Sequence, residues 1–265
     1  MERTASAWGD EGRAKKSGAG RPARRARMRA WSPTERPAAL DAWDTAAIAW
    51  AGALRGRLDT ARAIADEALV GVIRQVPTGP VLDAGCGEGW LAREMAAHGH
   101  KVTAFDGSPV MLELALQEGP DAADYRLLTF QEAAAGPRRM GGAFGTIVFN
   151  FSLLDERITP VLTAAGAVLF PYGRILIQAA HPASAEAYGA EGYRDGWRTL
   201  AEAAPGAPLP SPVPWYFRTF TTWVLELRRA GLLLVESYEP LDPATGRPVS
   251  LLLSATIPEK RRPKS

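Results

Sequence analysis

The stretch VLDAGCGEG, residues 81–89, decides the fold expected for this chain of 265 residues. Two apolar residues run into Asp83, and Gly85, Gly87 and Gly89 then alternate with other residues before a new apolar segment begins. Glycines at this spacing permit a sharp bend and let a ligand come close to the backbone. The stretch therefore predicts a nucleotide-type turn between a strand and a helix.

A second motif follows at the end of the next predicted strand, residues 101–106. Asp106 lies 21 residues after Gly85, where a carboxylate can accept hydrogen bonds from the two hydroxyls of a ribose. Trp90 stands where a dinucleotide fingerprint needs Gly or Ala, and no Gly-Lys-Ser/Thr follows as a Walker loop requires. The two motifs together predict a ligand that contains adenosine, and Trp90 disfavours a dinucleotide.

Alternating strand-like and helix-like segments surround these motifs. We expect strands at 81–84, 101–106, 124–129, 145–150 and 173–180, with helices near 89–98, 109–117 and 157–168. Strand segments such as TIVFN and RILIQ are almost continuously apolar, which is typical of strands covered on both faces. Residues 232–239 and 250–257 are joined by a short turn, which fits a hairpin. The pattern predicts an α/β fold with a doubly wound, mostly parallel sheet that ends in an antiparallel pair.

The domain organisation follows from charge and composition. Residues 1–30 hold 9 Lys and Arg against 3 Asp and Glu, whereas the other 235 residues hold 22 against 26. We expect residues 1–38 to be a disordered basic tail, 39–258 a single domain, and 259–265 a second basic tail. Within the domain, residues 39–78 should form two helical pieces that divide at Gly56, with Asp59 as an N-cap of the second. Residues 181–218, rich in Pro, Gly, Tyr and Trp, should form an insertion.

Several classes of protein are disfavoured by what the sequence lacks. A single cysteine, Cys86, excludes an internal disulfide and a cysteine-rich metal site, so we expect no metal. No apolar run approaches the ~20 residues needed to span a bilayer, and the chain starts without the apolar segment of a secretion signal. We therefore expect a cytoplasmic protein with no membrane partner.

The motifs resemble those of a known family. VLDAGCGEGWLA followed by VTAFDGSPVMLELA is similar to the first two motifs of the Rossmann-like (class I) S-adenosylmethionine-dependent methyltransferases of the small-molecule type. The similarity continues through FGTIVFNFSLLDE and GRILIQAAHP to the terminal TGRPVSLLLSATIP, so it covers about residues 40–258. It implies a seven-stranded sheet with an antiparallel last strand, helices on both faces, and S-adenosyl-L-methionine as the cofactor.

The resemblance also assigns residues to the cofactor. The glycine loop would wrap the methionine part, Asp106 would hold the ribose, and the segment LLTFQEA would line the adenine without the family's usual acidic residue. The cofactor-binding residues expected are Asp83, Gly85, Cys86, Gly87, Gly89, Asp106, Gly107, Met111, Phe130, Gln131 and Asn150.

The acceptor should lie beyond the carboxyl ends of the strands, where ligands bind in such sheets. Asn150 and His181 follow two of these strands and are the candidate catalytic residues, with His181 as a base or as a group that orients the acceptor. The candidate substrate-binding residues are Phe151, Ser152, His181, Trp215, Tyr216 and Arg218. Trp43 and Trp50 would either form a lid over the cofactor, as in related enzymes, or simply pack their helix.

The sequence thus predicts a methyltransferase of the EC 2.1.1 class that moves a methyl group to an O, N or C atom of a small organic acceptor. The chain has NFSL after the fourth strand, where amino-methylating DNA enzymes have Asp/Asn-Pro-Pro-Tyr/Phe, and its body is net acidic, so a nucleic-acid acceptor is not expected. The alternatives are an NAD(P)-dependent oxidoreductase and a non-catalytic S-adenosylmethionine-binding protein of the same fold. A monomer and a homodimer are both compatible with the sequence.

Overall fold

A computed structural model describes residues 38–56, 60–182, 192–204 and 207–258. The two predicted basic tails, apart from Ala38, and the predicted N-cap Asp59 lie outside the described residues. The helices are α1 (Ala38–Gly56), α2 (Thr60–Ile73), α3 (Trp90–Ala97), α4 (Pro109–Glu118), α5 (Phe130–Ala135), α6 (Thr159–Ala167) and α7 (Phe220–Arg229), with a 3-10 turn η1 (Pro137–Met140).

The main sheet has seven strands in the order β3-β2-β1-β4-β5-β9-β8. They are β1 (Pro80–Ala84), β2 (Lys101–Asp106), β3 (Asp124–Leu127), β4 (Phe144–Asn150), β5 (Leu169–Ala180), β8 (Leu233–Tyr238) and β9 (Ser250–Thr256). The first five pair in parallel, whereas β9 runs antiparallel to both β5 and β8. The predicted fold class, with its reversed last strand, is confirmed, and β9 inserts between β5 and β8.

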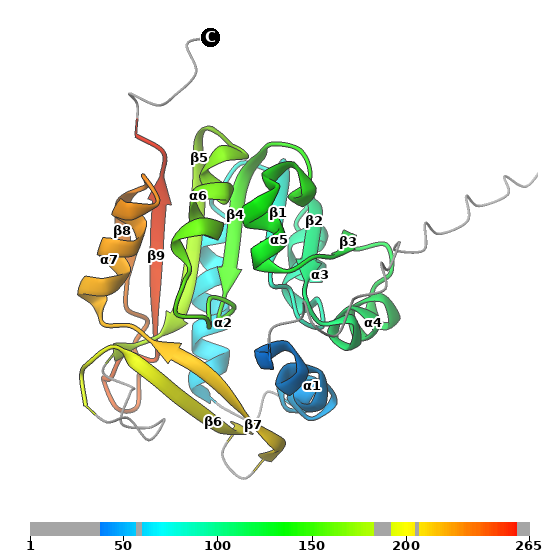
Figure 1. The fold of residues 1–265 in the computed structure, drawn as a ribbon, viewed down its shortest axis with the longest axis vertical. Helices are drawn as coiled ribbons and strands as arrows, with labels where there is room; N and C mark the ends of the chain where they lie inside the picture. The colour runs from blue at the N-terminus through cyan, green and yellow to red at the C-terminus, as the bar shows by residue number, and fades with distance from the viewer. Residues whose placement is uncertain (1–37, 57–59, 183–191, 205–206, 259–265) are drawn as a thin grey trace, which may run out of the picture.

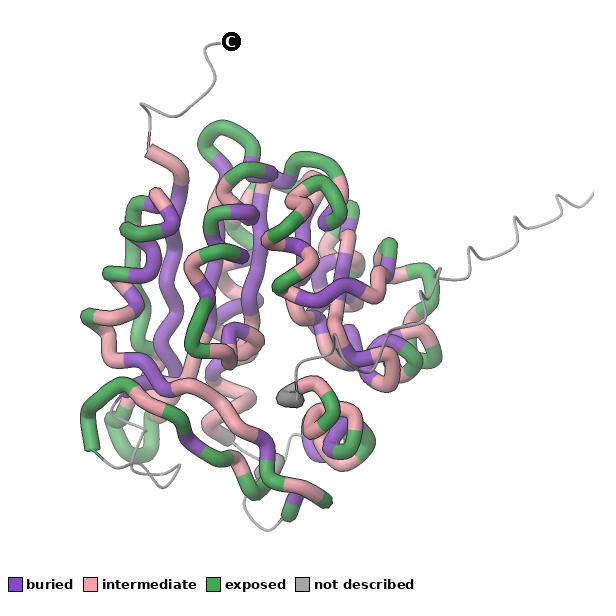
Figure 2. The backbone as a smooth tube through the Cα atoms, viewed as in Figure 1, coloured by how far each residue is buried: buried purple, intermediate pink, exposed green. Residues whose placement is uncertain are grey.

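Helices cover both faces of this sheet (Figure 1). One apolar cluster joins α2, α3 and α4 to strand residues such as Val81, Val148 and Leu252. Another joins α5, α6 and α7 to their strand neighbours, such as Leu82 and Ile147. Successive strand side chains point to opposite faces, so both sets must be apolar, which explains the nearly continuous runs in the sequence. The central strands are accordingly buried along most of their length (Figure 2).

The predicted insertion contains a structure that the sequence did not indicate. Its strands β6 (Gly196–Ala204) and β7 (Ala207–Phe217) form a separate antiparallel ribbon. Prolines 208, 210, 212 and 214 remove alternate N–H groups from β7, and proline is uncommon inside a strand. Tyr216 is the next residue in this alternating series, and its N–H donates to Leu154 O at 2.8 Å and not to β6. The N–H positions that the prolines occupy therefore lie on the side of β7 that points away from β6. Prolines are therefore tolerated because this edge of β7 needs few donors.

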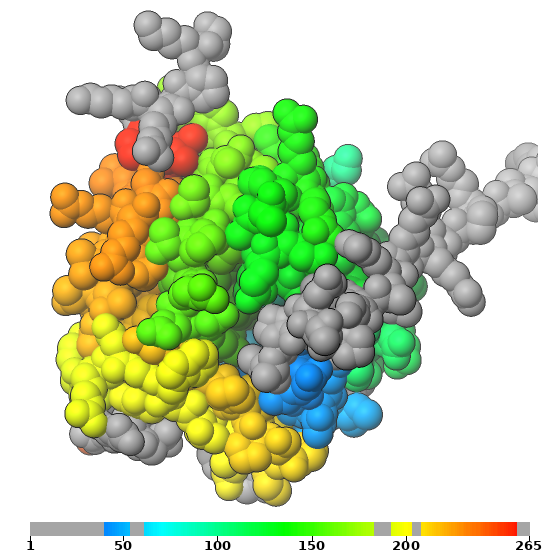
Figure 3. Space-filling view, viewed as in Figure 1, coloured from blue at the N-terminus to red at the C-terminus, as the bar shows by residue number. Residues whose placement is uncertain are grey.

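α1 packs against this ribbon, and the two together form what is here called the cap. Its small apolar cluster contains Ala46 of α1 with Leu209 and Val213 of β7, and Trp43 and Trp50 pack on it. In the space-filling view the blue surface of α1 adjoins the yellow surface of the ribbon below the main sheet (Figure 3). In the part of the chain that the structure describes, no helix combines the length and the apolar character needed to cross a membrane.

Candidate functional site

A cavity lies between the cap and the carboxyl ends of β1, β2 and β4. It measures about 1260 Å³, including the space at its open mouth. Twelve of the predicted site residues line it: Asp83, Gly85, Cys86, Gly87, Asp106, Gly107, Met111, Phe130, Gln131, Asn150, Phe151 and Ser152.

The glycine loop forms one wall of the cavity. Gly85 and Gly87 have φ angles of 76° and 55°, in the left-handed region that side chains rarely adopt. A Cβ on Gly85 would lie 2.5 Å from Ser152 Cβ, so packing alone requires glycine there. A Cβ on Gly87 would meet nothing within 4 Å, so it would project into open space. A ligand can therefore approach the backbone closely at Gly87, which lines the cavity.

Asp106 is held by the same loop. Its Oδ2 accepts a hydrogen bond from Gly87 N at 2.9 Å, and its Oδ1 accepts one from Ser108 N at 2.8 Å. Burial raises the pKa of Asp106, while these main-chain donors act in the opposite direction. Each carboxylate oxygen has a second lone pair, so both can also accept a hydrogen bond from a ligand hydroxyl.

Asp83 stands deeper in the cavity, at the end of β1. The residue is 1% exposed, and its Oδ2 has no hydrogen-bond partner among the described residues. Burial raises its pKa to about 8, and the charges of Asp106 and Glu88 add to the shift. Asn150 Oδ1, at the end of β4, is likewise buried without a partner in the described part of the chain. Unsatisfied buried polar atoms are costly, so two of them on one cavity point to a ligand that supplies donors.

The opposite end of the cavity is formed where β3 leads into α5. Thr129 caps α5, because its hydroxyl accepts from Glu132 N and the Glu132 carboxylate accepts from Thr129 N. Phe130 begins the helix and stacks edge-on against Phe105, with ring centroids 5.7 Å apart. The predicted strand 124–129 is therefore two residues too long. The T-x-x-E spacing of a capping box was the missed signal for α5.

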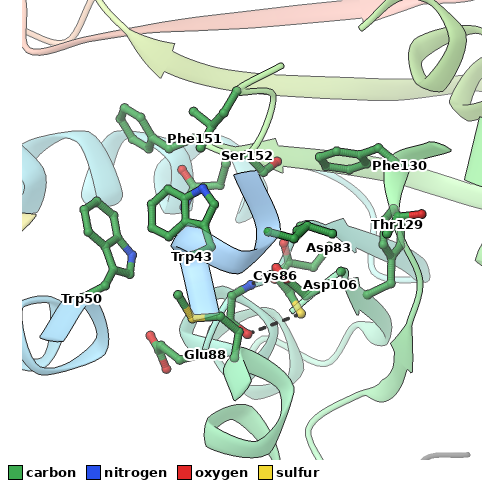
Figure 4. A pocket seen from close by; sticks show the side chains of 18 of the residues that line it. Trp43, Trp50, Asp83, Cys86, Glu88, Asp106, Thr129, Phe130, Phe151 and Ser152 are labelled. Carbon is green, nitrogen blue, oxygen red and sulfur yellow. Dashed lines mark hydrogen bonds between the residues drawn. The ribbon is translucent and has the colours of Figure 1, made fainter. Parts of the chain in front are cut away.

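Figure 4 shows how the cap and the strand ends meet around the cavity. Trp43 and Trp50 project from α1, with ring centroids 5.2 Å apart in an edge contact. Phe151, directly after β4, has a φ of 50°, which is unusual for a residue other than glycine. The Arg62 guanidinium of α2 lies 4.7 Å from the centre of its ring.

His181 is not placed as the sequence predicted. It is absent from the lining of the cavity, and its Nε2 lies 2.9 Å from Glu239 Oε1 in the segment after β8. The last residues of β5 pair with β9, and the chain after them lies beside that hairpin rather than beside the end of β1. The position of His181 therefore gives no support to a role as a base in this cavity.

Arg218 also has a different place from the one predicted. Its side chain is 2% exposed and does not line the cavity. Its guanidinium donates to main-chain oxygens of Leu153, Asp155 and Tyr216. Burial lowers the pKa of Arg218 to about 10, so the group remains a cation at neutral pH. Arg218 thus fixes the loop after β4 instead of contacting a ligand.

Three further predicted residues lie outside the cavity lining. Trp215 and Tyr216 pack within the cap, each edge-on against another aromatic ring of β6 or β7. Gly89 precedes α3 as its N-cap with a φ of 80°, and a Cβ there would lie 2.8 Å from Tyr125 Oη. The third glycine of the motif is therefore required for close packing behind the loop.

Sequence reasoning did not select several residues that line the cavity. Arg62 lies in the second of the two helical pieces predicted within residues 39–78, and Leu40 lies at the start of α1; neither stands in a motif. Asp155 stands five residues beyond Asn150, in the run NFSLLDE. Trp197 of β6 lies in the predicted insertion, where nothing in the sequence distinguishes it from the other aromatic residues. Of these, only Asp155 had a signal in the sequence, because it is a carboxylate close to a predicted strand end.

Comparison with known proteins agrees with this geometry. Residues 81–173 match the model of a family described as a methyltransferase domain. The ubiquinone biosynthesis O-methyltransferase of Xanthomonas euvesicatoria is 32% identical over 103 residues, which are 37% of this chain and 41% of that protein. The matched region thus spans about two fifths of the curated relatives.

Solved structures extend the likeness to most of the chain. The 1,6-didemethyltoxoflavin-N1-methyltransferase of Burkholderia thailandensis, with bound S-adenosylhomocysteine, is 22% identical, with a TM-score of 0.55, 86% of this chain covered and 91% of that one. The glycopeptide N-methyltransferase MtfA complexed with S-adenosylmethionine is 19% identical, with a TM-score of 0.56 and coverages of 73% and 94%. Residues 81–173 thus match a methyltransferase-domain model, and the chain as a whole has the Rossmann-like fold seen in these solved methyltransferases.

Proposed function

We propose that the protein is an S-adenosylmethionine-dependent methyltransferase that acts on a small organic molecule. The observation that carries the proposal is the unobstructed backbone at Gly87 on the same cavity as the carboxylates of Asp83 and Asp106. The Oδ2 atom of Asp83 is buried without a hydrogen-bond partner among the described residues. Such a site suits a ligand with a ribose and a positively charged amine. The names of the matched relatives support the same class of reaction.

The residues present fit this cofactor. Asp106 would accept hydrogen bonds from the ribose hydroxyls, and Asp83 would pair with the α-ammonium of the methionine part. The segment from Thr129 to Gln131, at the other end of the same wall, would line the adenine. When bound, the cofactor supplies a methyl group that is already activated by the positive charge on sulfur. The protein therefore needs mainly to bind, align and exclude water.

Arg62 is the group that fits the cofactor's carboxylate. Its Nε donates to Asp66 Oδ1 at 2.8 Å, and no described residue accepts a hydrogen bond from its two terminal nitrogens. The side chain is 19% exposed, so its charge is only partly screened by water. A guanidinium and the Asp83 carboxylate on one cavity are complementary to the two charges of an amino acid.

Replacing Arg62 by glutamine should weaken binding of S-adenosylhomocysteine about tenfold, since a charge-assisted pair is worth about 1.5–3 kcal/mol. Isothermal titration calorimetry measures the change. Methylthioadenosine, which lacks the amino-acid part, should bind both proteins equally. Arg74→Gln is the matched control, because Arg74 lies just after α2 but pairs with the exposed Glu67. Equal loss for both ligands would contradict the assignment.

Binding and turnover test the function itself. We expect saturable binding of S-adenosylhomocysteine by calorimetry and transfer of a labelled methyl group to a member of a panel of small aromatic and heteroaromatic acceptors. Tighter binding of NAD(H) than of S-adenosylhomocysteine would favour an oxidoreductase instead. Cofactor binding with no transfer to any acceptor would favour a non-catalytic binding protein.

A further inference from the structure

Most of the ionisable groups that line the cavity are paired, are neutral, or are assigned to the cofactor, and so are not available to bind an acceptor. Glu88 is 4% exposed at its side chain and pairs with Arg93, with 2.7 Å between Oε2 and Nη2. Cys86 is buried, and its surroundings raise the pKa of its thiol, so it remains neutral. Under the proposed function, Asp83, Asp106 and Arg62 face the cofactor. The carboxylate of Asp155 is the group left over.

Asp155 lies in the loop after β4 and lines the cavity. Its Oδ2 is 3.5 Å from Gln131 Nε2, and its Oδ1 is 3.5 Å from Arg157 N. Both distances are at the outer limit of hydrogen bonding, so both contacts are weak. No Lys, Arg or His side chain among the described residues forms an ion pair with this carboxylate. Asp155 therefore has acceptor capacity to spare for a ligand.

The loop that carries Asp155 is held in place by buried contacts. The Arg218 guanidinium donates to the main-chain oxygens of Leu153 and Asp155, and the main-chain N–H of Tyr216 donates to Leu154 O at 2.8 Å. These contacts connect three successive residues of the loop to β7 and to the residue that follows it. The carboxylate is thus presented from a fixed backbone, which lowers the entropy lost when it binds a ligand.

Three tryptophan side chains of the cap also line the cavity. Trp43 and Trp50 come from α1 and Trp197 from β6, and all three belong to the lining. Trp197 is 49% exposed, so its ring is available to a ligand at the mouth. Flat aromatic surfaces favour a flat ligand, and their faces also attract positive charge.

We propose that Asp155 is the acceptor-binding carboxylate and that the acceptor is a flat aromatic or heteroaromatic amine, methylated on a nitrogen that carries hydrogen. This inference rests on the proposed function. Positive charge moves from sulfur to the acceptor atom as the methyl group is transferred, and a carboxylate beside that atom stabilises the change. An anionic acceptor such as a phenolate would instead be repelled.

The transfer is balanced as follows. The nitrogen lone pair forms the new N–CH₃ bond, the S–CH₃ bond breaks, and its electron pair stays on sulfur. The N–H proton moves to the Asp155 carboxylate. A sulfonium, a neutral amine and a carboxylate thereby become a neutral thioether, a neutral methylated amine and a carboxylic acid.

Benzamidine and benzoate are a matched pair of probes, because they share one ring and differ in whether the planar group donates from a cation or accepts as an anion. With the protein saturated with S-adenosylhomocysteine, we expect benzamidine to bind at least about tenfold more tightly than benzoate, as measured by quenching of tryptophan fluorescence. Asp155→Asn should reduce this preference to about twofold. Glu156→Gln, at the exposed neighbouring residue outside the lining, should leave it unchanged.

The outcomes separate this inference from the function on which it rests. Failure of wild-type protein to bind S-adenosylhomocysteine would overturn the proposed function. If that ligand binds equally to wild type and to Asp155→Asn, then equal binding of the two probes, binding of neither, or a preference retained in Asp155→Asn would overturn the role of Asp155 alone.

Discussion

Gly87→Ala is expected to lower the affinity for S-adenosylhomocysteine about 100-fold, or about 2.7 kcal/mol. The new methyl group would project into the open space of the cavity, where nothing else lies within 4 Å, and would occupy volume that a close-fitting ligand needs. It would also strain the loop whose N–H holds Asp106 Oδ2 at 2.9 Å. Calorimetric titration measures the loss directly.

Gly99→Ala provides the control for backbone strain. Gly99 has a φ of 84° and lies outside the cavity lining, and its added Cβ would touch only Thr78 Cγ2 at 3.9 Å. Both substitutions put a side chain in the left-handed region, at a cost of about 1–2 kcal/mol, so both should lower the melting temperature by a similar amount. Only Gly87→Ala should lose cofactor affinity. A comparable loss in both variants would mean that the loop acts through stability and not through contact.

The parts of the site closest to the sheet could be predicted from the sequence. A glycine-rich turn and an acidic residue at the next strand end are constrained together, because parallel pairing aligns the carboxyl ends of neighbouring strands. Pairing in register places Asp83 opposite Ala104 and Ala84 opposite Phe105, which brings the loop to Asp106. The spacing of the glycine loop and Asp106 in the sequence was therefore enough to predict that they lie together in the structure.

The parts outside the sheet could not be predicted in the same way. Arg62 faces the cavity only because α2 packs across the sheet at a particular rotation, and helical periodicity does not fix which neighbour a polar residue meets. Trp197 lines the cavity because a proline-rich segment pairs as a ribbon, against the usual preference of proline. His181 lies outside the cavity lining for a related reason. Strand ends need not all face one ligand, and β5 lies next to β9, separated from β1 and its glycine loop by β4.

Binding of S-adenosylhomocysteine should become tighter as the pH rises, through Asp83. Burial raises the pKa of this carboxyl to about 8, so below that pH the group is mostly neutral in the unliganded protein. Pairing with an ammonium requires the ionised form, so binding must release a proton. From about pH 6 to about pH 8 the ionised fraction rises from about 1% to about 50%, and the affinity should rise about 50-fold. Calorimetry in buffers of different ionisation enthalpy counts the released proton.

Asp83→Asn should lower the affinity for S-adenosylhomocysteine but raise the stability of the unliganded protein relative to wild type at high pH. Without a charge to offer, the variant should bind weakly and with little dependence on pH over this range. In the wild type the folded state keeps the proton to higher pH than the unfolded state, whose value is 3.8, so Asp83 makes the folded protein less stable as the pH rises from 3.8 to about 8. The melting temperature of Asp83→Asn relative to wild type should therefore increase with pH in the absence of ligand. A variant that lost both affinity and stability at pH 8 would show that Asp83 stabilises the fold itself, because removing a charge that is unfavourable in the unliganded folded state should raise stability at that pH.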